Sequence, residues 1–259
     1  MHCQDLNKQP KKTLKNKLLF WGSVALIIGG GYIYMSLPED PRRVSISIEL
    51  PAETEALPYE VRYRSSICKN KYRDGDFNAR YEDDRRYVEV IPKKQGGSNI
   101  YKETISVDDG GYCKWKLSNI IIGFQYKKNS SILNNIEENT PVKVKFVFDD
   151  YASATSNRQP KEEYNDFIVQ KNYYPLKKEF IDNNRKSIVS IKGEQNSLTY
   201  QLYIPNEIVY KPILHTNKMV TVIEPANRED KFKIIYPDGT ITDVDSAYPL
   251  DFEKIINMR

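Results

Sequence analysis

The feature that most constrains this chain is a run of twenty residues without a charged side chain, Leu18 to Leu37. At about 1.5 Å rise per residue, such a run forms a helix of about 30 Å, the thickness of the hydrocarbon core of a bilayer. Trp21 lies near one end and Tyr32 and Tyr34 near the other, where amphipathic rings favour the membrane interface. The sequence therefore predicts a transmembrane helix over residues 18–37.

A cleaved signal peptide is the alternative interpretation of this run. Signal peptides have a shorter apolar stretch, of about 7–15 residues, followed by a cleavage site with small residues. Here the run is longer, no site of the A-x-A kind follows it, and Cys3 precedes it, so no cysteine stands ready to accept a lipid. These features favour an uncleaved signal-anchor helix.

The residues on either side of the helix predict its orientation. The tail of residues 1–17 is rich in lysine, and basic flanks stay on the cytoplasmic side. The lysines are Lys8, Lys11, Lys12, Lys15 and Lys17. We therefore expect a single-pass membrane protein with a cytoplasmic N-terminus, a linker at residues 38–43, and an exported domain beyond it. The targeting pattern and the lysine- and asparagine-rich sequence suit a bacterial source, in which the membrane would be the inner membrane and the domain periplasmic.

This arrangement changes the meaning of the net charge. The whole chain carries a formal charge of +4, and the tail, with its lysines and Asp5, supplies all of it. The remaining residues are balanced, so the basic isoelectric point does not indicate nucleic-acid binding. No nucleic-acid partner is expected.

Two cysteines, Cys68 and Cys113, lie in the predicted exported part. In an oxidising compartment such a pair most simply forms one disulfide, which would stabilise the fold by about 4 kcal/mol. Two free buried thiols are the alternative. A zinc site is disfavoured, because His215 is the one histidine of that part and no Cys-x-x-Cys spacing occurs. We expect no metal and no cofactor.

Alternating apolar and polar residues predict a mainly β fold after the helix. Val44, Ile46, Ile48 and Leu50 alternate with polar residues, as in a half-buried strand. Similar patterns recur up to about residue 150 at a spacing typical of a β-sandwich. The sequence predicts a sandwich-like domain at 44–150, a loop-rich connection at 151–187 with a short helix around Glu162 to Val169, and a second small β lobe at 188–259.

The clearest local prediction is a hairpin over Lys231 to Val244. Pro237-Asp238-Gly239 fits a three-residue loop with glycine in the left-handed conformation. That register pairs Lys233 with Asp243 and Ile235 with Ile241 and leaves the face of Phe232, Ile234, Tyr236 and Val244 for burial. Asp251 to Met258 is expected to form a short terminal helix.

The sequence lacks the motifs of a catalytic site. It contains no G-x-S-x-G elbow, no H-E-x-x-H and no glycine-rich phosphate loop, and nothing near His215 marks a triad partner. Asp74 to Asn78 starts like a calcium loop, but Ala79 and Arg85 stand where Gly and Glu are needed, so a hairpin turn is favoured. We expect a protein that is not an enzyme.

Tyrosine is unusually frequent, with nineteen residues against nine Phe and two Trp. Lys69 to Arg86 interleaves aromatic side chains with arginines, a combination typical of protein interfaces. A solvated mixed-charge loop is the alternative. The interface hypothesis selects Tyr72, Arg73, Phe77, Arg80, Tyr81, Arg85 and Arg86 as partner-binding residues.

The layout resembles the membrane-anchored periplasmic immunity proteins of bacterial type VI secretion systems, and is most similar to those encoded beside phospholipase effectors. The resemblance rests on Lys11 to Leu37, on the segment Arg62 to Cys68, and on Tyr112-Cys113-Lys114-Trp115. It implies a protein that binds and blocks a toxic effector, such as a secreted lipase, without catalysis of its own. A non-catalytic scaffold subunit of a cell-envelope assembly is the alternative.

Overall fold

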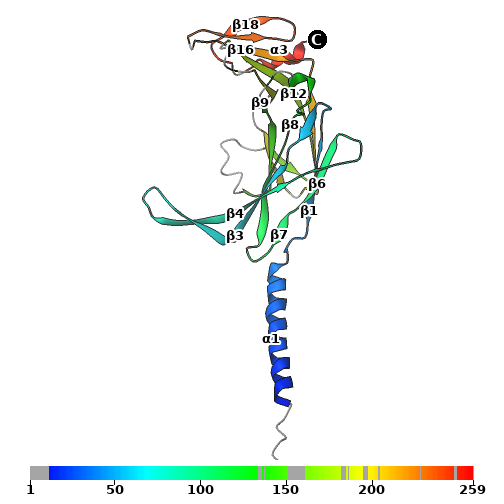
Figure 1. The fold of residues 1–259 in the computed structure, drawn as a ribbon, viewed down its shortest axis with the longest axis vertical. Helices are drawn as coiled ribbons and strands as arrows, with labels where there is room; N and C mark the ends of the chain where they lie inside the picture. Colours follow the sequence, from blue (N-terminus) through cyan, green and yellow to red (C-terminus); the bar gives the residue numbers. More distant parts are fainter. Residues whose placement is uncertain are drawn as a thin grey trace, which may run out of the picture.

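A single long helix, α1 (Lys12–Ser36), leads into a body made of β-strands in the computed structural model (Figure 1). The structure describes residues 12–133, 136, 138–150, 161–181, 185, 187–194, 198–203, 205–227, 229–247 and 250–258. Within α1, Asn16–Ser36 is long and apolar enough to cross a membrane, and its large apolar side chains are exposed. The expected mainly β fold after one N-terminal helix is confirmed.

Two sheets form the body. The first runs, in spatial order, through β18 (Ile241–Val244), β17 (Phe232–Ile235), β16 (Val220–Glu224), β12 (Phe167–Phe180), β15 (Glu207–Leu214), β1 (Arg43–Glu49), β6 (Ile100–Ser106) and β5 (Lys93–Lys94). Beside this path, β13 (Ile188–Gly193) pairs with β12 and with β9 (Glu138–Thr140). The second sheet runs through β11 (Lys161–Tyr164), β14 (Leu198–Tyr203), β10 (Val142–Val147), β8 (Trp115–Tyr126), β3 (Tyr59–Arg73) and β4 (Ala79–Val90), and β2 (Thr54–Ala56) and β7 (Asp108–Gly110) also pair with β8. A short 3-10 helix, η1 (Ser131–Leu133), follows β8.

The two sheets pack face to face around one main hydrophobic core. Val44, Ile46 and Ile48 of β1 are fully buried, because their alternation places all three on one face of the first sheet. Aromatic rings join the sheets: Phe124 of β8 lies 5.4 Å from Tyr173 of β12, centroid to centroid. The β-sandwich interpretation follows from this contact between layers.

A second, smaller core lies at the end of the body far from α1 (Figure 1). It contains Leu176 of β12, Val220 of β16, Ile234 of β17 and Ile255 of α3 (Phe252–Asn257). Strand β12 belongs to both cores, since Phe167 and Val169 near its start lie in the main one. The two lobes therefore share a strand.

The predicted boundaries of the two lobes do not follow the strand pairing. Strands β14 and β15, which lie in the predicted second lobe, pair in parallel with β10 and β1 of the first. Their buried residues, such as Tyr200 and Ile208, belong to the main core. The small lobe combines the end of β12 with β16 to β18 and α3. Local periodicity identifies strands but carries no information about such long-range parallel partners.

The predicted loop-rich connection was also wrong in its described part. Residues 161–164 and 167–180 are strands, so the expected helix around Glu162 to Val169 does not form. Phe167 and Val169 point into the core, but Ile168 between them is exposed and Pro175 interrupts the pattern further on. An apolar residue at an outward position and a proline within the run break the alternation of apolar and polar residues by which a strand is recognised in a sequence. Residues 151–160 lie outside the described residues.

The C-terminal hairpin was predicted correctly. Lys233 pairs with Asp243 and Ile235 with Ile241, and Gly239 has a φ of 83°. Ile234 is buried in the small core, and α3 follows with Asp251 as its N-cap. Local turn chemistry was sufficient here because the partners are neighbours in sequence.

Candidate interaction surface

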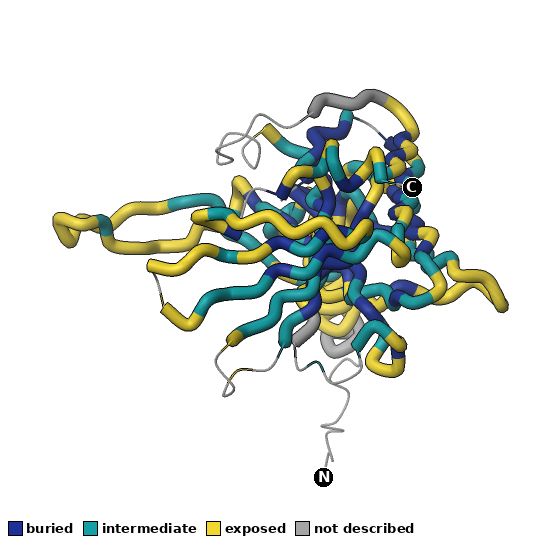
Figure 2. The backbone as a smooth tube through the Cα atoms, turned by 90° about the horizontal axis from the view of Figure 1, so that it is seen from above, coloured by how far each residue is buried: buried dark blue, intermediate teal, exposed yellow. Residues whose placement is uncertain are grey.

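The most prominent surface feature is the outer part of the β3–β4 hairpin, which we call the arm and define as residues 69–83. Figures 1 and 2 show it extending away from the body, well beyond the neighbouring strands. Strand β8 pairs with β3 only as far as Arg64, whereas residues 69–73 and 79–83 pair with each other. Within the described residues, the arm is thus a free two-stranded ribbon.

A β-bulge with its own hydrogen bonds forms the base of the arm. The register of β3 against β4 shifts between Ser65 and Lys69. The buried Ser65 hydroxyl accepts hydrogen bonds from the backbone N–H groups of Ile67 (3.2 Å) and Cys68 (2.9 Å) and donates one to the carbonyl oxygen of Cys113. The bulge leaves these N–H groups without ladder partners, and the hydroxyl satisfies them.

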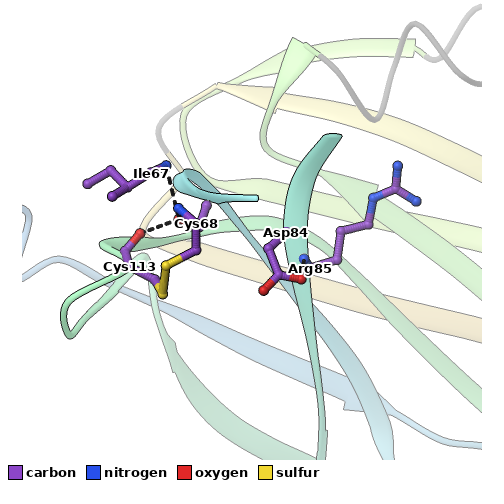
Figure 3. The surroundings of a disulfide bond; sticks show 6 residues. Ile67, Cys68, Asp84, Arg85 and Cys113 are labelled. Atoms are coloured by element: carbon purple, nitrogen blue, oxygen red, sulfur yellow. Dashed lines mark hydrogen bonds between the residues drawn. A yellow bond between two sulfur atoms is a disulfide. The ribbon is translucent and has the colours of Figure 1, made fainter. Parts of the chain in front are cut away.

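The predicted disulfide is present at this base. Cys68 and Cys113 are bonded, with their Cα atoms 5.2 Å apart, which confirms the pairing. Figure 3 shows the bond beside β4, where Asp84 and Arg85 lie. The disulfide ties the arm to the turn between β7 and β8.

Ion pairs hold the two strands of the arm together near this bond. Asp83 of β4 accepts from Lys69 (2.5 Å) and from Arg64 (2.9 Å), and Arg64 also binds Asp149 (3.0 Å). The hydrogen bond from Lys69, together with the two positive charges, holds the pKa of Asp83 below its usual value. An isolated two-stranded ribbon is marginally stable in water, so these contacts stabilise a segment that would otherwise fray.

Asp74 organises the tip of the arm. Its carboxylate accepts hydrogen bonds from the N–H groups of Asp76 (3.0 Å) and Asn78 (2.9 Å) and from the Arg80 guanidinium (2.8 Å). The Arg80 bond in particular lowers the pKa of the Asp74 carboxyl. These bonds engage both oxygens, which fits the predicted turn, and no metal-binding cluster of His, Cys, Asp or Glu occurs among the described residues.

Phe77 is the most exposed aromatic side chain of the tip. Its side chain is 78% exposed, and its backbone has a φ of 62°, in the left-handed region that bulky residues rarely adopt. A left-handed non-glycine residue costs about 1–2 kcal/mol. The arm therefore holds a large apolar ring in water on a strained backbone, and neither feature contributes to stability.

The other selected residues of the arm lie on its two faces. Residues directly opposite each other in an antiparallel pair share a face. Tyr72 lies opposite Arg80, and Tyr81 lies opposite Lys71, whose ammonium group is 6.0 Å from the centre of the tyrosine ring. Tyr72 and Tyr81 are 45% and 65% exposed. The arm thus presents an aromatic and a cationic side chain on each face.

Lys71 was not selected from the sequence. The signal that identifies it is the register, which follows once Asp74 to Asn78 is recognised as the turn. Arg73, which was selected, lies opposite Ala79 on the same face as Lys71.

Arg85 and Arg86 lie at the base rather than on the arm. The Arg86 guanidinium lies 5.2 Å from the ring centre of Tyr63 and 5.1 Å from that of Trp115, and it pairs with Asp109. Arg85 binds Glu82 at 3.0 Å. The structure therefore separates the selected residues into an exposed arm group and two arginines engaged in contacts within the fold.

The tyrosine-rich composition has a second explanation. Several tyrosines lie in the cores of the protein: Tyr59, Tyr63, Tyr173 and Tyr174 are buried. The hydroxyl groups of Tyr173 and Tyr210 hydrogen-bond each other in the core, and burial raises the pKa of Tyr173 to about 12. Composition alone does not distinguish such core tyrosines from those of a binding surface.

His215 occupies a structural position. Its Nε2 atom lies 3.0 Å from the amide oxygen of Asn172, and its ring stacks on Tyr174 with centroids 5.0 Å apart. Burial, with a smaller effect of Lys218, lowers the pKa of this histidine. Both contacts hold the ring against β12.

Comparison with protein-family models, curated proteins and solved structures gives no match for this sequence.

Proposed function

We propose that this chain is an uncleaved, membrane-anchored bacterial protein whose β domain lies in the periplasm and neutralises a toxic effector by direct contact through the arm. The helix α1 supports the anchor, since it combines a spanning length with large apolar side chains that are exposed. The disulfide supports an oxidising compartment, because such bonds persist outside the cytoplasm. The lysine-rich tail supports a cytoplasmic N-terminus.

One observation carries the binding role: the arm is braced from base to tip and yet exposes the aromatic rings of Tyr72, Phe77 and Tyr81. Exposed aromatic rings do not stabilise the free protein, but burying them against a partner would contribute free energy of binding, because aromatic and arginine anchors supply most of the binding energy of interfaces. A braced hairpin also loses little conformational entropy when it binds.

The shape of the arm indicates the kind of partner. A narrow ribbon with an aromatic tip is suited to a concave surface, as long binding loops are. The substrate cleft of a secreted lipase-type toxin is such a surface, and an arm seated in it would block substrate entry. This mode of action needs no catalytic group in the chain itself.

Protection in cells tests the proposal. The full chain is co-expressed with the periplasmically targeted toxin encoded beside its gene, and survival is compared for the wild-type chain, Phe77→Ser and a control, Ile241→Ser. Ile241 is 60% exposed on β18 at the far end of the body. We expect protection by the wild type and the control, and its loss with Phe77→Ser at equal protein levels.

Two results would contradict the proposal. One is a chain that neither binds the toxin nor protects against it. The other is a Phe77→Ser chain that protects as well as the wild type, which would remove the arm from the mechanism. Stable co-purification with envelope components in the absence of any toxin would instead support the scaffold role.

A further inference from the structure

The turn between β7 and β8, residues 110–114, lies directly against the end of α1 (Figure 1). The N–H group of Gly111 donates to the carbonyl oxygen of Ser36 (2.8 Å), and the Lys114 ammonium group donates to that of Leu37 (3.0 Å). These carbonyls belong to the last turn of the helix and the residue after it, where intrahelical donors are missing. The turn therefore caps the helix from outside.

The contact is too close for a side chain. Gly110 has a φ of 58°, and a Cβ atom on it would lie 2.5 Å from the Ser36 carbonyl oxygen and 3.0 Å from the Pro38 nitrogen. Gly111 also has a positive φ, of 71°, but a Cβ atom there would meet nothing closer than Trp115, at 4.0 Å. Of these two glycines, Gly110 alone makes room for the chain leaving the helix.

Asp108 fixes the linker that follows. Its buried carboxylate accepts hydrogen bonds from the backbone N–H groups of Glu39 (2.9 Å) and Asp40 (3.1 Å) and pairs with Lys116 (2.7 Å). The segment that was expected to be a simple extended linker is thus bound along its length. The helix and the β domain are joined at several points rather than by one flexible strand.

This arrangement has a consequence if α1 spans a bilayer, as the proposed function holds. The apolar run ends at Leu37, so the carbonyls that bind the turn lie at the boundary between hydrocarbon and headgroups. The turn bound to them must lie in the headgroup layer. There it presents Tyr112, which is 71% exposed, and Lys114.

Both residue types suit that layer. Tyrosine is enriched at membrane interfaces because its ring is apolar and its hydroxyl polar, and an ammonium group attracts anionic headgroups. Lys114 has three donor hydrogens, of which the Leu37 contact uses one. We infer that the β7–β8 turn is a second membrane contact, in which Tyr112 and Lys114 bind phospholipid headgroups beside the helix and hold the β domain in a fixed orientation.

The second contact also bears on the arm. The disulfide joins Cys113 of this turn to Cys68 at the base of the arm. A turn held at the membrane therefore sets the height at which the arm extends. The partner would meet the arm close to the lipid surface, where a lipase-type toxin acts.

Fluorescence quenching in reconstituted full-length protein tests the inference. The chain is placed in nanodiscs of phosphatidylethanolamine and phosphatidylglycerol that contain a lipid with a headgroup-linked nitroxide. Tryptophan is introduced as Tyr112→Trp or, as a control far from α1, as Ile241→Trp, each with Trp21→Phe. The difference in fluorescence between the wild type and Trp21→Phe gives the emission of the native Trp21 in α1, and its quenching reports insertion of the helix.

The fluorescence of the introduced tryptophan is the emission of each variant minus that of Trp21→Phe, which still contains Trp115. We expect the nitroxide lipid to quench most of this fluorescence at position 112 and none of it at position 241. Gly110→Ala should reduce the quenching at 112, whereas Gly111→Ala, with the same left-handed strain but no clash, should not. Equal quenching at positions 112 and 241, together with quenching of Trp21, would overturn the inference and leave the anchor intact. Absence of quenching of the Trp21 fluorescence would instead contradict the anchor itself.

Discussion

The Ser65 hydroxyl group donates a hydrogen bond to the Cys113 carbonyl oxygen, forty-eight residues further along the chain. The same oxygen of Ser65 binds two N–H groups of the bulge at the base of the arm. One small side chain thus joins the arm, the disulfide and the turn that contacts α1.

Replacing Ser65 with alanine should lower the free energy of unfolding by about 1–3 kcal/mol, because two N–H groups and one carbonyl group lose the partner of their part-buried hydrogen bonds. The exposed neighbour provides the control: Ser66→Ala should leave stability within about 0.5 kcal/mol of the wild type. Denaturant unfolding in detergent measures both. Equal stabilities of the two variants would show that the hydroxyl has no bridging role.

Removing the disulfide should destabilise the domain and loosen the arm. The double variant Cys68→Ser, Cys113→Ser is expected to lose about 2–4 kcal/mol of stability. Hydrogen exchange should rise most in residues 69–83, since that ribbon has no third strand to support it. The control is Cys3→Ser in the tail. An arm that exchanges as slowly without the bond as with it would contradict this role.

At the tip, substitution of Phe77 should affect stability and binding through two separate features, the backbone conformation and the ring. Phe77→Gly should be more stable than Phe77→Ser by about 1 kcal/mol, because glycine adopts the left-handed conformation without strain. Both variants should bind the effector at least tenfold more weakly than the wild type, since both lack the ring. Thermal unfolding and a binding assay on the same preparations check the two halves. Phe77→Gly binding as the wild type does would show that the ring is not a contact.

The linker should detach in acid. Burial opposes ionisation of Asp108, but hydrogen bonds from Lys116 and from the N–H groups of Gly110, Asp40 and Glu39 outweigh it, so its folded-state pKa is lowered. A group with a lowered pKa contributes stability above its unfolded pKa, about 3.9 for aspartate, and loses it as the pH falls through the folded value. The protection factors of the Glu39 and Asp40 N–H groups, which compare each exchange rate with the intrinsic rate at the same pH, should therefore fall below about pH 4.

Asp108→Asn is the matched variant for this prediction. It keeps one acceptor oxygen but removes the charge that binds Lys116, so the protection factors of Glu39 and Asp40 should already be low at neutral pH and change little in acid. Protection factors of Glu39 and Asp40 in the wild type that stay constant from pH 7 to pH 3 would contradict the role of Asp108.

Sequence reasoning succeeded where the interacting residues are close in the chain or chemically unique. The hairpin around Gly239 and the terminal helix depend on local turn and cap chemistry. The Cys68–Cys113 bond followed from there being one pair in the predicted exported part. In each case few alternatives competed.

It failed where tertiary partners decide the outcome. Parallel pairing of β1 with β15 joins residues 43–49 to residues 207–214, and no local pattern encodes that partner. The sequence also placed Arg86 with the aromatic and basic residues of the arm, whereas in the fold its guanidinium lies 5.2 Å from the ring centre of Tyr63 and 5.1 Å from that of Trp115. Charge and residue type are visible in a sequence, whereas burial is not.

The most direct test of the central claim is the affinity of the purified full-length chain, in detergent, for the effector of the proposed function, a secreted lipase-type toxin of the same organism, measured by titration calorimetry. The wild type is compared with the arm variants Tyr72→Ser, Phe77→Ser and Tyr81→Ser and with the distant Ile241→Ser. We predict a one-to-one complex that Ile241→Ser preserves and that each arm variant weakens at least tenfold, as expected when an anchor worth about 1.4 kcal/mol or more is lost. Tight binding that none of the arm variants alters would contradict the account, and so would the absence of any complex.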